Sequence, residues 1–111
     1  MKWFKALNAI QIPVNGNIKT IEVNGKQLCI INNENEIIAT QSFCPHAGGH
    51  FSGGWCKNGQ LICPIHQYGY DLKTGRGAEG QGDCIDIYPT EVREDGLYIG
   101  FEKSWWSKLW G

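Results

Sequence analysis

The sequence predicts an all-β protein made of short antiparallel strands. The 111-residue chain contains 15 glycines and 4 prolines, which suits a fold with many tight turns. Several short runs alternate polar and apolar side chains, the period of a strand with one buried face. No long segment repeats its apolar positions with the period of a helix.

The clearest single element is a hairpin in the first half of the chain. Residues 19–23 and 27–31 flank Asn24-Gly25, the dipeptide best suited to a two-residue hairpin turn. Alternation then divides the apolar side chains of the second strand between two faces, Leu28 with Ile30 and Cys29 with Ile31.

Further strands are expected on both sides of this hairpin. In chain order they cover residues 3–7, 36–43, 60–62 and 83–88, followed by a closing hairpin of 90–93 and 97–101, while residues 68–72 follow the second ligand loop. Lys57-Asn58-Gly59 is typical of a turn. Residues 73–82 are rich in glycine and polar side chains and should form a long exposed loop.

Two pairs of ligand-type residues interrupt these strands. Cys44-Pro45-His46 begins one tight loop, and Cys63-Pro64-Ile65-His66 begins another after residues 47–62. Each loop supplies one thiolate and one imidazole, and the glycines between the pairs allow sharp bends. Two sulfur and two nitrogen donors that converge from two loops predict a metal site at Cys44, His46, Cys63 and His66.

The distribution of these ligands bears on the identity of the metal. A zinc finger usually keeps its two cysteines in one short pair and its two histidines in another. Here each loop supplies one of each, which suits a two-iron cluster with both thiolates on one iron and both imidazoles on the other. The alternative is a zinc-stabilised β module that binds a partner and carries no electron.

On these residues the sequence resembles the Rieske family, whose cluster motif is Cys-Pro-His followed at this separation by Cys-Pro-Ile-His. Residues 70–75 look like the family's segment after the second loop, and the resemblance runs from about residue 10 to about residue 101. It implies an antiparallel β sandwich or partial barrel in a single domain of residues 1–102. An inserted subdomain of two ligand loops, at about residues 43–70, would hold one Rieske [2Fe-2S] cluster through the four ligands.

The same resemblance assigns roles to the neighbours of the ligands. High-potential members carry an inter-loop disulfide at the positions of Gly49 and Ile65, so this chain resembles the disulfide-free, ferredoxin-like branch. Those members have serine where this chain has Tyr68 and tyrosine at the position of Tyr70. We therefore expect a midpoint potential in the low half of the Rieske range, raised by a hydrogen bond from the Tyr70 hydroxyl to a cysteine sulfur. A role for Tyr70 as a packed aromatic is the alternative. Gln67 departs from the glycine common in the family directly after the second histidine.

The third histidine and the three remaining cysteines have no assigned ligand role. His50 is expected to be a solvated loop residue, with a spare ligand or a proton relay as the alternatives. Cys29 should be a small buried hydrophobe, and Cys56 should be exposed and oxidisable. Cys84 fits either face of its strand, and a Cys56–Cys84 disulfide is not expected in a reducing compartment.

The composition excludes several classes of function. Ten basic and eleven acidic residues give a formal charge of −1, which argues against nucleic-acid binding and gives no basis for electrostatic steering. No apolar run is long enough for a transmembrane helix, and the first residues make a poor secretory signal. A cytoplasmic location is therefore expected.

Residues 103–111 form a tail rich in tryptophan. Trp106 and Trp110, like Trp105 and Leu109, are four residues apart, so one helical turn could present both pairs. We expect the tail to fold back over the domain's own apolar surface. Docking of a partner or a membrane surface by Trp105, Trp106 and Trp110 is one alternative, and disorder is the other.

The resemblance implies a one-electron carrier that takes electrons from a flavin reductase and passes them to a Rieske-type oxygenase. Both partners would dock in turn and weakly near His46 and His66. No catalytic residue is expected, because the sequence has no dinucleotide-binding fingerprint and no second set of histidine and carboxylate ligands. The alternative within the family is the small Rieske-like subunit of an assimilatory nitrite reductase.

Overall fold

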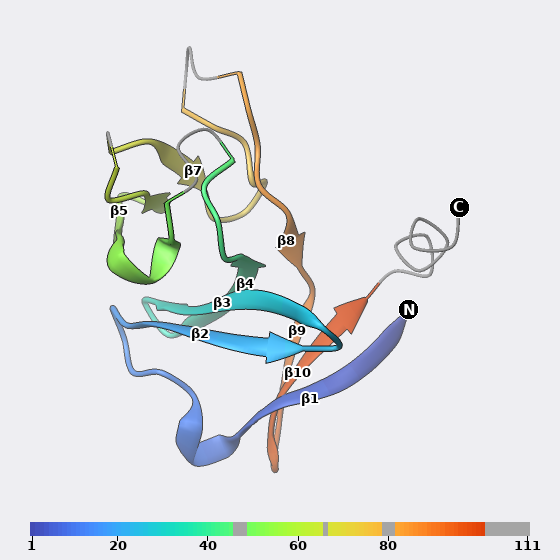
Figure 1. The fold of residues 1–111 in the computed structure, drawn as a ribbon. Coiled ribbons are helices and arrows are strands. Elements are labelled where there is room, and N and C mark those ends of the chain that lie inside the picture. The colour runs from blue at the N-terminus through green and yellow to red at the C-terminus, as the bar shows by residue number, and fades with distance from the viewer. Residues whose placement is uncertain (46–48, 66, 79–81, 102–111) are drawn as a thin grey trace, which may run out of the picture.

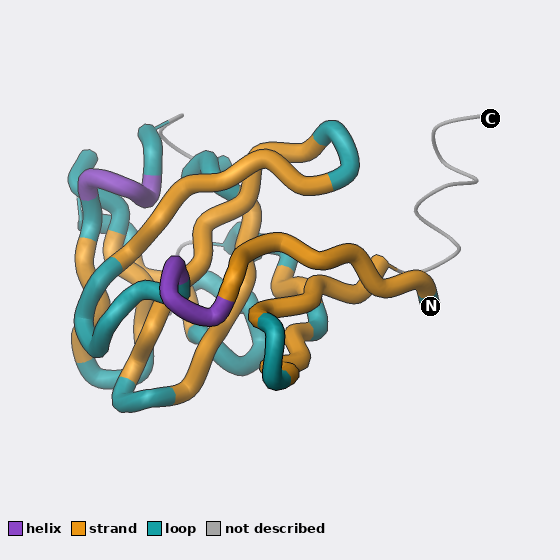
Figure 2. The backbone as a smooth tube through the Cα atoms, turned by 90° about the horizontal axis from the view of Figure 1, so that it is seen from below, coloured by secondary structure: helices purple, strands orange, loops and turns teal. Residues whose placement is uncertain are grey.

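The computed structural model describes residues 1–45, 49–65, 67–78 and 82–101. Strands dominate it, with short helical turns between them (Figure 2). Within these ranges no helix is long and apolar enough to cross a membrane. The predicted ligands His46 and His66, and the tail that carries Trp105, Trp106 and Trp110, lie outside the described residues.

The strands form three antiparallel sheets (Figure 1). The first sheet contains, in spatial order, β1 (Lys2–Asn8), β10 (Gly96–Phe101) and β9 (Thr90–Arg93). The second contains β2 (Ile18–Val23), β3 (Lys26–Asn33), β4 (Glu36–Gln41) and β8 (Ile87–Tyr88). The third contains β5 (Trp55–Lys57), β6 (Gln60–Ile62) and β7 (Gly69–Asp71). Single-turn 3₁₀ helices cover Ala9–Gln11 (η1) and Phe51–Gly53 (η2).

The second sheet lies between the first sheet and the small third sheet (Figure 1). This arrangement confirms the predicted antiparallel β fold with a subdomain inserted after β4. The insertion carries both ligand loops: one links β4 to β5, and the other links β6 to β7.

The two asparagine–glycine turns adopt the backbone conformation that their sequence predicts. Asn24 and Gly25 have φ values of 50° and 76° between paired Val23 and Lys26. Asn58 and Gly59, with φ values of 52° and 75°, join β5 to β6 in the same way. Left-handed conformation at both central positions gives a turn whose twist matches that of the flanking strands.

Strand β3 contributes to both hydrophobic cores of the molecule. Leu28 and Ile30 pack with residues of the first sheet, including Leu97, Ile99 and Phe101. Cys29 and Ile31 point to the other side and pack with the core beneath the ligand loops, which contains Phe51, Leu61 and Tyr70. The alternation predicted from the sequence is confirmed. Through it, one buried strand connects the core beside the first sheet to the core beneath the ligand loops.

Two predicted strands are shorter than expected. The strand expected at 36–43 ends at Gln41, and Phe43 then forms an isolated bridge with His50. The strand expected at 83–88 is reduced to Ile87–Tyr88. The reason is that Cys84 and Ile85 pair with the preceding loop: Cys84 bridges Arg76, and the Ile85 N–H donates to the Gly75 carbonyl.

The expectation of an exposed loop at 73–82 is wrong for Gly75. This residue is buried, with φ of 78°, and its carbonyl accepts a 2.7 Å hydrogen bond from the Ile85 N–H. A Cβ at this position would collide with the Ile85 carbonyl oxygen. The loop therefore folds back against the chain that follows it, a long-range contact that local composition does not reveal.

Replacing Gly75 with alanine should destabilise the protein by roughly 2 kcal/mol, because it adds both a strained backbone conformation and a collision with backbone. Gly59→Ala is the matched control: its φ is 75°, but a Cβ there meets nothing within 4 Å. Urea unfolding of the cluster-loaded protein measures the difference. Equal losses of stability in the two variants would show that the Ile85 contact contributes nothing.

Candidate metal centre between two loops

The first ligand loop is closed at its base by backbone pairing. The Cys44 N–H donates to the Gly49 carbonyl at 2.8 Å, and the Phe51 N–H donates to the Ser42 carbonyl at 3.0 Å. Phe43 and His50 form an antiparallel bridge between these two bonds. Cys44 is therefore anchored at the paired base of this loop.

The second ligand loop repeats the same hydrogen bond. The Cys63 N–H donates to the Tyr68 carbonyl at 2.8 Å, five positions later in the chain as in the first loop. The hairpin of β6 and β7 supports this loop, with Ile62 paired to Gly69. Gln67 turns the chain back with φ of 55°, in the left-handed region. That conformation gives a physical reason for the glycine that the family has at this position.

The two loops bring the Cys44 and Cys63 sulfurs together. Both residues are buried, with 1% and 0% exposure. A Cβ placed on Gly49 would lie 3.1 Å from the Cys63 sulfur, so the first loop packs directly against the ligand of the second. Burial raises the pKa of the Cys63 thiol; the Ile65 N–H partly offsets this, and the adjacent Cys44 sulfur raises the pKa further. A buried thiol that resists ionisation, next to a second buried thiol, fits a site where a bound cation supplies the compensating charge.

Tyr70 is a packed aromatic side chain whose hydroxyl also reaches a cysteine sulfur. Its ring is fully buried and packs edge-on against Phe51, with centroids 5.7 Å apart. Its hydroxyl oxygen lies 3.3 Å from the Cys44 sulfur. Burial first, and then the neighbouring Cys44 and Asp83, raise the pKa of Tyr70 far above its ordinary value.

Asp83 is a neighbour of the site that the sequence analysis did not identify. Its Oδ2 accepts a 3.0 Å hydrogen bond from the Tyr70 hydroxyl. The residue follows the glycine-rich loop, and nothing in the local pattern indicates contact with β7. Only the return of that loop, in which Gly77 bridges Tyr70 and donates its N–H to the Asp83 carbonyl, brings it there.

The other neighbours take the following places. Ile65 occupies the space above Gly49, where a Cβ would lie 2.8 Å from its Cδ1, so the two positions that match the family's disulfide are adjacent. Tyr68 is half-buried against the core beneath the loops, and Gln67 is exposed. His50 is exposed, and its ring lies against Phe43 with centroids 4.5 Å apart.

All five cysteines lie in the described ranges, and none of them forms a disulfide there. Cys29 is buried, as expected, with its sulfur 3.7 Å from the Thr20 hydroxyl. Cys84 is exposed, whereas Cys56 is only half-buried rather than exposed because it packs against the core beneath the ligand loops.

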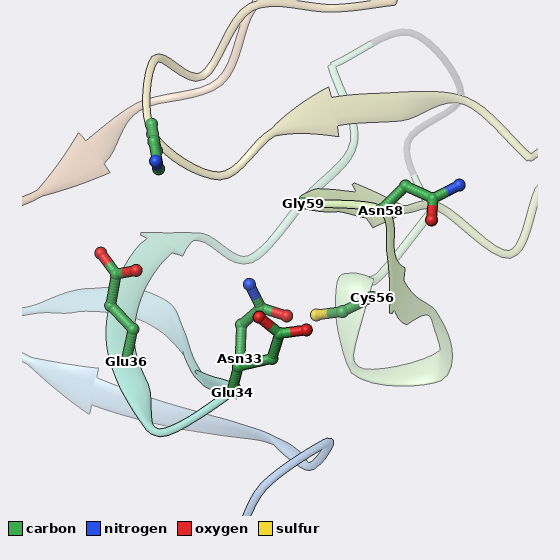
Figure 3. Close-up of a pocket in the computed structure, with 7 residues that line it drawn as sticks. Asn33, Glu34, Glu36, Cys56, Asn58 and Gly59 are labelled. Carbon is green, nitrogen blue, oxygen red and sulfur yellow. The ribbon is translucent and has the colours of Figure 1, made fainter.

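A polar cavity lies apart from the two loops, between the β3–β4 turn and the β5–β6 turn (Figure 3). Its lining includes the half-buried Cys56 and the carboxylates of Glu34 and Glu36. In the part of the chain that the structure describes, no three His, Cys, Asp or Glu side chains are grouped to hold a metal ion. Only two of the four predicted ligands fall in that part, so Cys44 and Cys63 are the portion of the site whose geometry is visible.

Comparison with known proteins identifies the family. The Rieske [2Fe-2S] domain matches residues 2–90. The ferredoxin component of the naphthalene 1,2-dioxygenase system of Pseudomonas aeruginosa is 36% identical, over 88% of this chain and 94% of its own length.

Solved structures with lower identity share the fold. A complex of reduced oxygenase and oxidised ferredoxin in carbazole 1,9a-dioxygenase contains a chain that matches 86% of this protein at 22% identity and a TM-score of 0.75, with 99% of that chain covered. A protein assigned as the small subunit of an NADH-dependent nitrite reductase from Mycobacterium tuberculosis matches 91% of this chain and 96% of its own, at 17% identity and a TM-score of 0.79. The loop geometry, the paired thiols and the match over most of the chain lead to one conclusion: this protein belongs to the Rieske [2Fe-2S] domain family, and its cofactor is a Rieske-type cluster rather than zinc.

Proposed function

We propose that this protein is a one-electron carrier that takes electrons from a reductase and delivers them to a Rieske-type oxygenase. The observation that carries the proposal is the 36% identity to a dioxygenase ferredoxin component along 94% of that component's length. A match of that extent accounts for the ferredoxin as a whole rather than for a shared domain. The paired buried thiols of the ligand loops agree with it.

In this proposal Cys44 and Cys63 bind one iron as thiolates, and His46 and His66 bind the other. The bound cluster supplies a centre that accepts and donates single electrons. The chain's part is to hold the donors in place: the Cys44 and Cys63 N–H bonds fix both loops, and Gly49 allows their close approach. Burial of both sulfurs keeps water from them.

We place the docking surface for both partners around the ligand loops, near His46 and His66. Two large apolar side chains next to the ligands are exposed: Phe43 is 44% exposed and Ile65 is 42% exposed. Such residues are typical of interfaces that form and separate repeatedly over a small area. With a formal charge of −1, the protein has little net charge to attract a partner, so contact here should depend mainly on apolar burial.

The nitrite reductase alternative has weaker support. The similarity to a small subunit of that enzyme is 17% identity, which supports the shared fold alone, whereas the ferredoxin component is 36% identical. A large subunit that stays bound through purification would favour the alternative. Trp105, Trp106 and Trp110 are proposed as a further docking element, for which the support is their composition.

The first test of the proposal is spectroscopic. The anaerobically purified protein should show visible absorption bands that bleach with dithionite and a rhombic EPR signal on reduction. Its midpoint potential should fall in the low half of the Rieske range of roughly −150 to +300 mV, because Tyr68 replaces the serine of high-potential members. It should then restore turnover when added to a dioxygenase and its flavin reductase. A colourless protein that contains one zinc would refute the proposal.

Gly49→Ala should reduce cluster retention about tenfold in a chelator challenge, since the added methyl group lies 3.1 Å from the Cys63 sulfur. Gly53→Ala is the control in the same segment, where a Cβ makes only an ordinary 3.5 Å contact with Pro64. Iron content and visible absorption report retention. The close approach of the loops is unimportant for binding if both variants keep their clusters equally well.

Phe43→Ser should raise the KM of the oxygenase for the reduced carrier about fivefold while the midpoint potential stays unchanged, because an apolar contact at the docking surface is lost. Val92→Ser is the control, since Val92 is 58% exposed on β9 of the first sheet. Steady-state turnover at several salt concentrations measures both variants. An equal effect at Val92 would place the contact elsewhere.

A further inference from the structure

The Tyr70 hydroxyl lies between two acceptors. Its oxygen is 3.3 Å from the Cys44 sulfur and 3.0 Å from the Asp83 Oδ2. The ring cannot shift toward either one, because it is fully buried and packed against Phe51. Asp83 is also held in place, because its carbonyl accepts a 2.9 Å hydrogen bond from the Gly77 N–H beside β7. The hydroxyl hydrogen can still rotate about the C–O bond and point to either acceptor.

The Cys44 sulfur and the Asp83 carboxylate compete for a single hydrogen, the one on the Tyr70 hydroxyl. A phenol has one hydrogen to donate, and a carboxylate has none. A cysteine that binds iron is deprotonated, so Cys44 also has no hydrogen to offer once the cluster is bound. One hydrogen therefore serves two negatively charged acceptors, and both lie within hydrogen-bond distance of the hydroxyl: the carboxylate oxygen at 3.0 Å and the larger sulfur at 3.3 Å. Hydrogen bonds to a carboxylate are among the strong ones.

We infer that Asp83 lowers the midpoint potential of the cluster by drawing the Tyr70 hydroxyl hydrogen away from the Cys44 sulfur. The inference rests on the proposed function, since it requires the cluster at Cys44. A hydrogen bond to a ligand sulfur favours the reduced, more negative form of a cluster and raises its potential. When the hydrogen points to Asp83, that increase is lost, and the Asp83 charge adds a smaller effect of the same sign. Asp83 acts through Tyr70 and is a positioning residue, not a ligand.

The test is a double-mutant cycle on the cluster-loaded protein. Asp83→Asn keeps the shape of the side chain and removes its charge, so the Tyr70 hydroxyl turns to the sulfur. We expect the equilibrium constant for one-electron reduction to rise about tenfold, which is about 59 mV. In the Tyr70→Phe background the same substitution should give a clearly smaller rise, from charge alone. Tyr70→Phe by itself should shift the potential little, because its hydrogen is already given to Asp83.

Two controls separate the effect of hydrogen direction from the effect of charge and from the effect of the asparagine amide. Asp86→Asn removes the same charge from an exposed position three residues further along, and should give the same small shift with tyrosine or phenylalanine at position 70. Asp83→Ala removes the carboxylate without adding an amide and should raise the midpoint potential, as Asp83→Asn does. Agreement between these two Asp83 variants excludes an effect of the asparagine amide.

Pulsed EPR of the reduced protein gives a second readout that does not depend on potential. Asp83→Asn should add an exchangeable proton coupling at the cluster, which exchange into D₂O removes and Tyr70→Phe abolishes. Equal shifts of potential in both backgrounds, without a new coupling, would overturn the role of Asp83 and leave the electron carrier intact. A wild-type protein without any cluster would instead overturn the proposed function, and this inference with it.

Discussion

Two backbone hydrogen bonds determine the geometry of the ligand site. Each runs from a cysteine N–H to the carbonyl five residues later, from Cys44 to Gly49 and from Cys63 to Tyr68. They fix the first residue of each loop at the end of a paired segment, which is where two buried sulfurs can approach each other. Without them, each loop would pay the conformational entropy of ordering its ligands when the metal binds. The rest of the fold holds these two hydrogen bonds at fixed positions relative to each other.

A single strand supports the relative position of the two loops. β3 pairs with β2 and β4, and its alternating side chains fill the scaffold core on one face and the core beneath the ligand loops on the other. Phe51 and Tyr70, which lie under the loops, pack in the same core as Cys29 and Ile31. Close packing of this kind transmits small shifts, so a change of volume at Cys29 reaches the site through directly touching side chains.

Local signals in the sequence were sufficient for the turns and for the position of most strands, whereas the complete set of four ligands stays a prediction because His46 and His66 lie outside the described residues. Asparagine–glycine pairs specify their turns through backbone conformation, and the alternation in β3 follows from burial on both faces. The sequence could not reveal the contacts that form when one segment folds back onto the segment that follows it. Gly75 is buried against Ile85, and Asp83 reaches Tyr70, only because residues 73–78 fold back onto the following segment. The approach of the two ligand loops was expected from their donors, but the packing of Gly49 directly against the Cys63 sulfur is visible only in the structure.

The ends of the fold meet far from the chemistry. Lys2 pairs with Phe101 at one edge of the first sheet, on the side of the molecule opposite β5 and β7 (Figure 1). A chain that enters and leaves at one place can be joined to other polypeptides at either end, or inserted into one, without disturbing what lies at the other side. The fold can thus be transferred between proteins as a unit, because the ligand loops and the two ends of the fold lie on opposite sides.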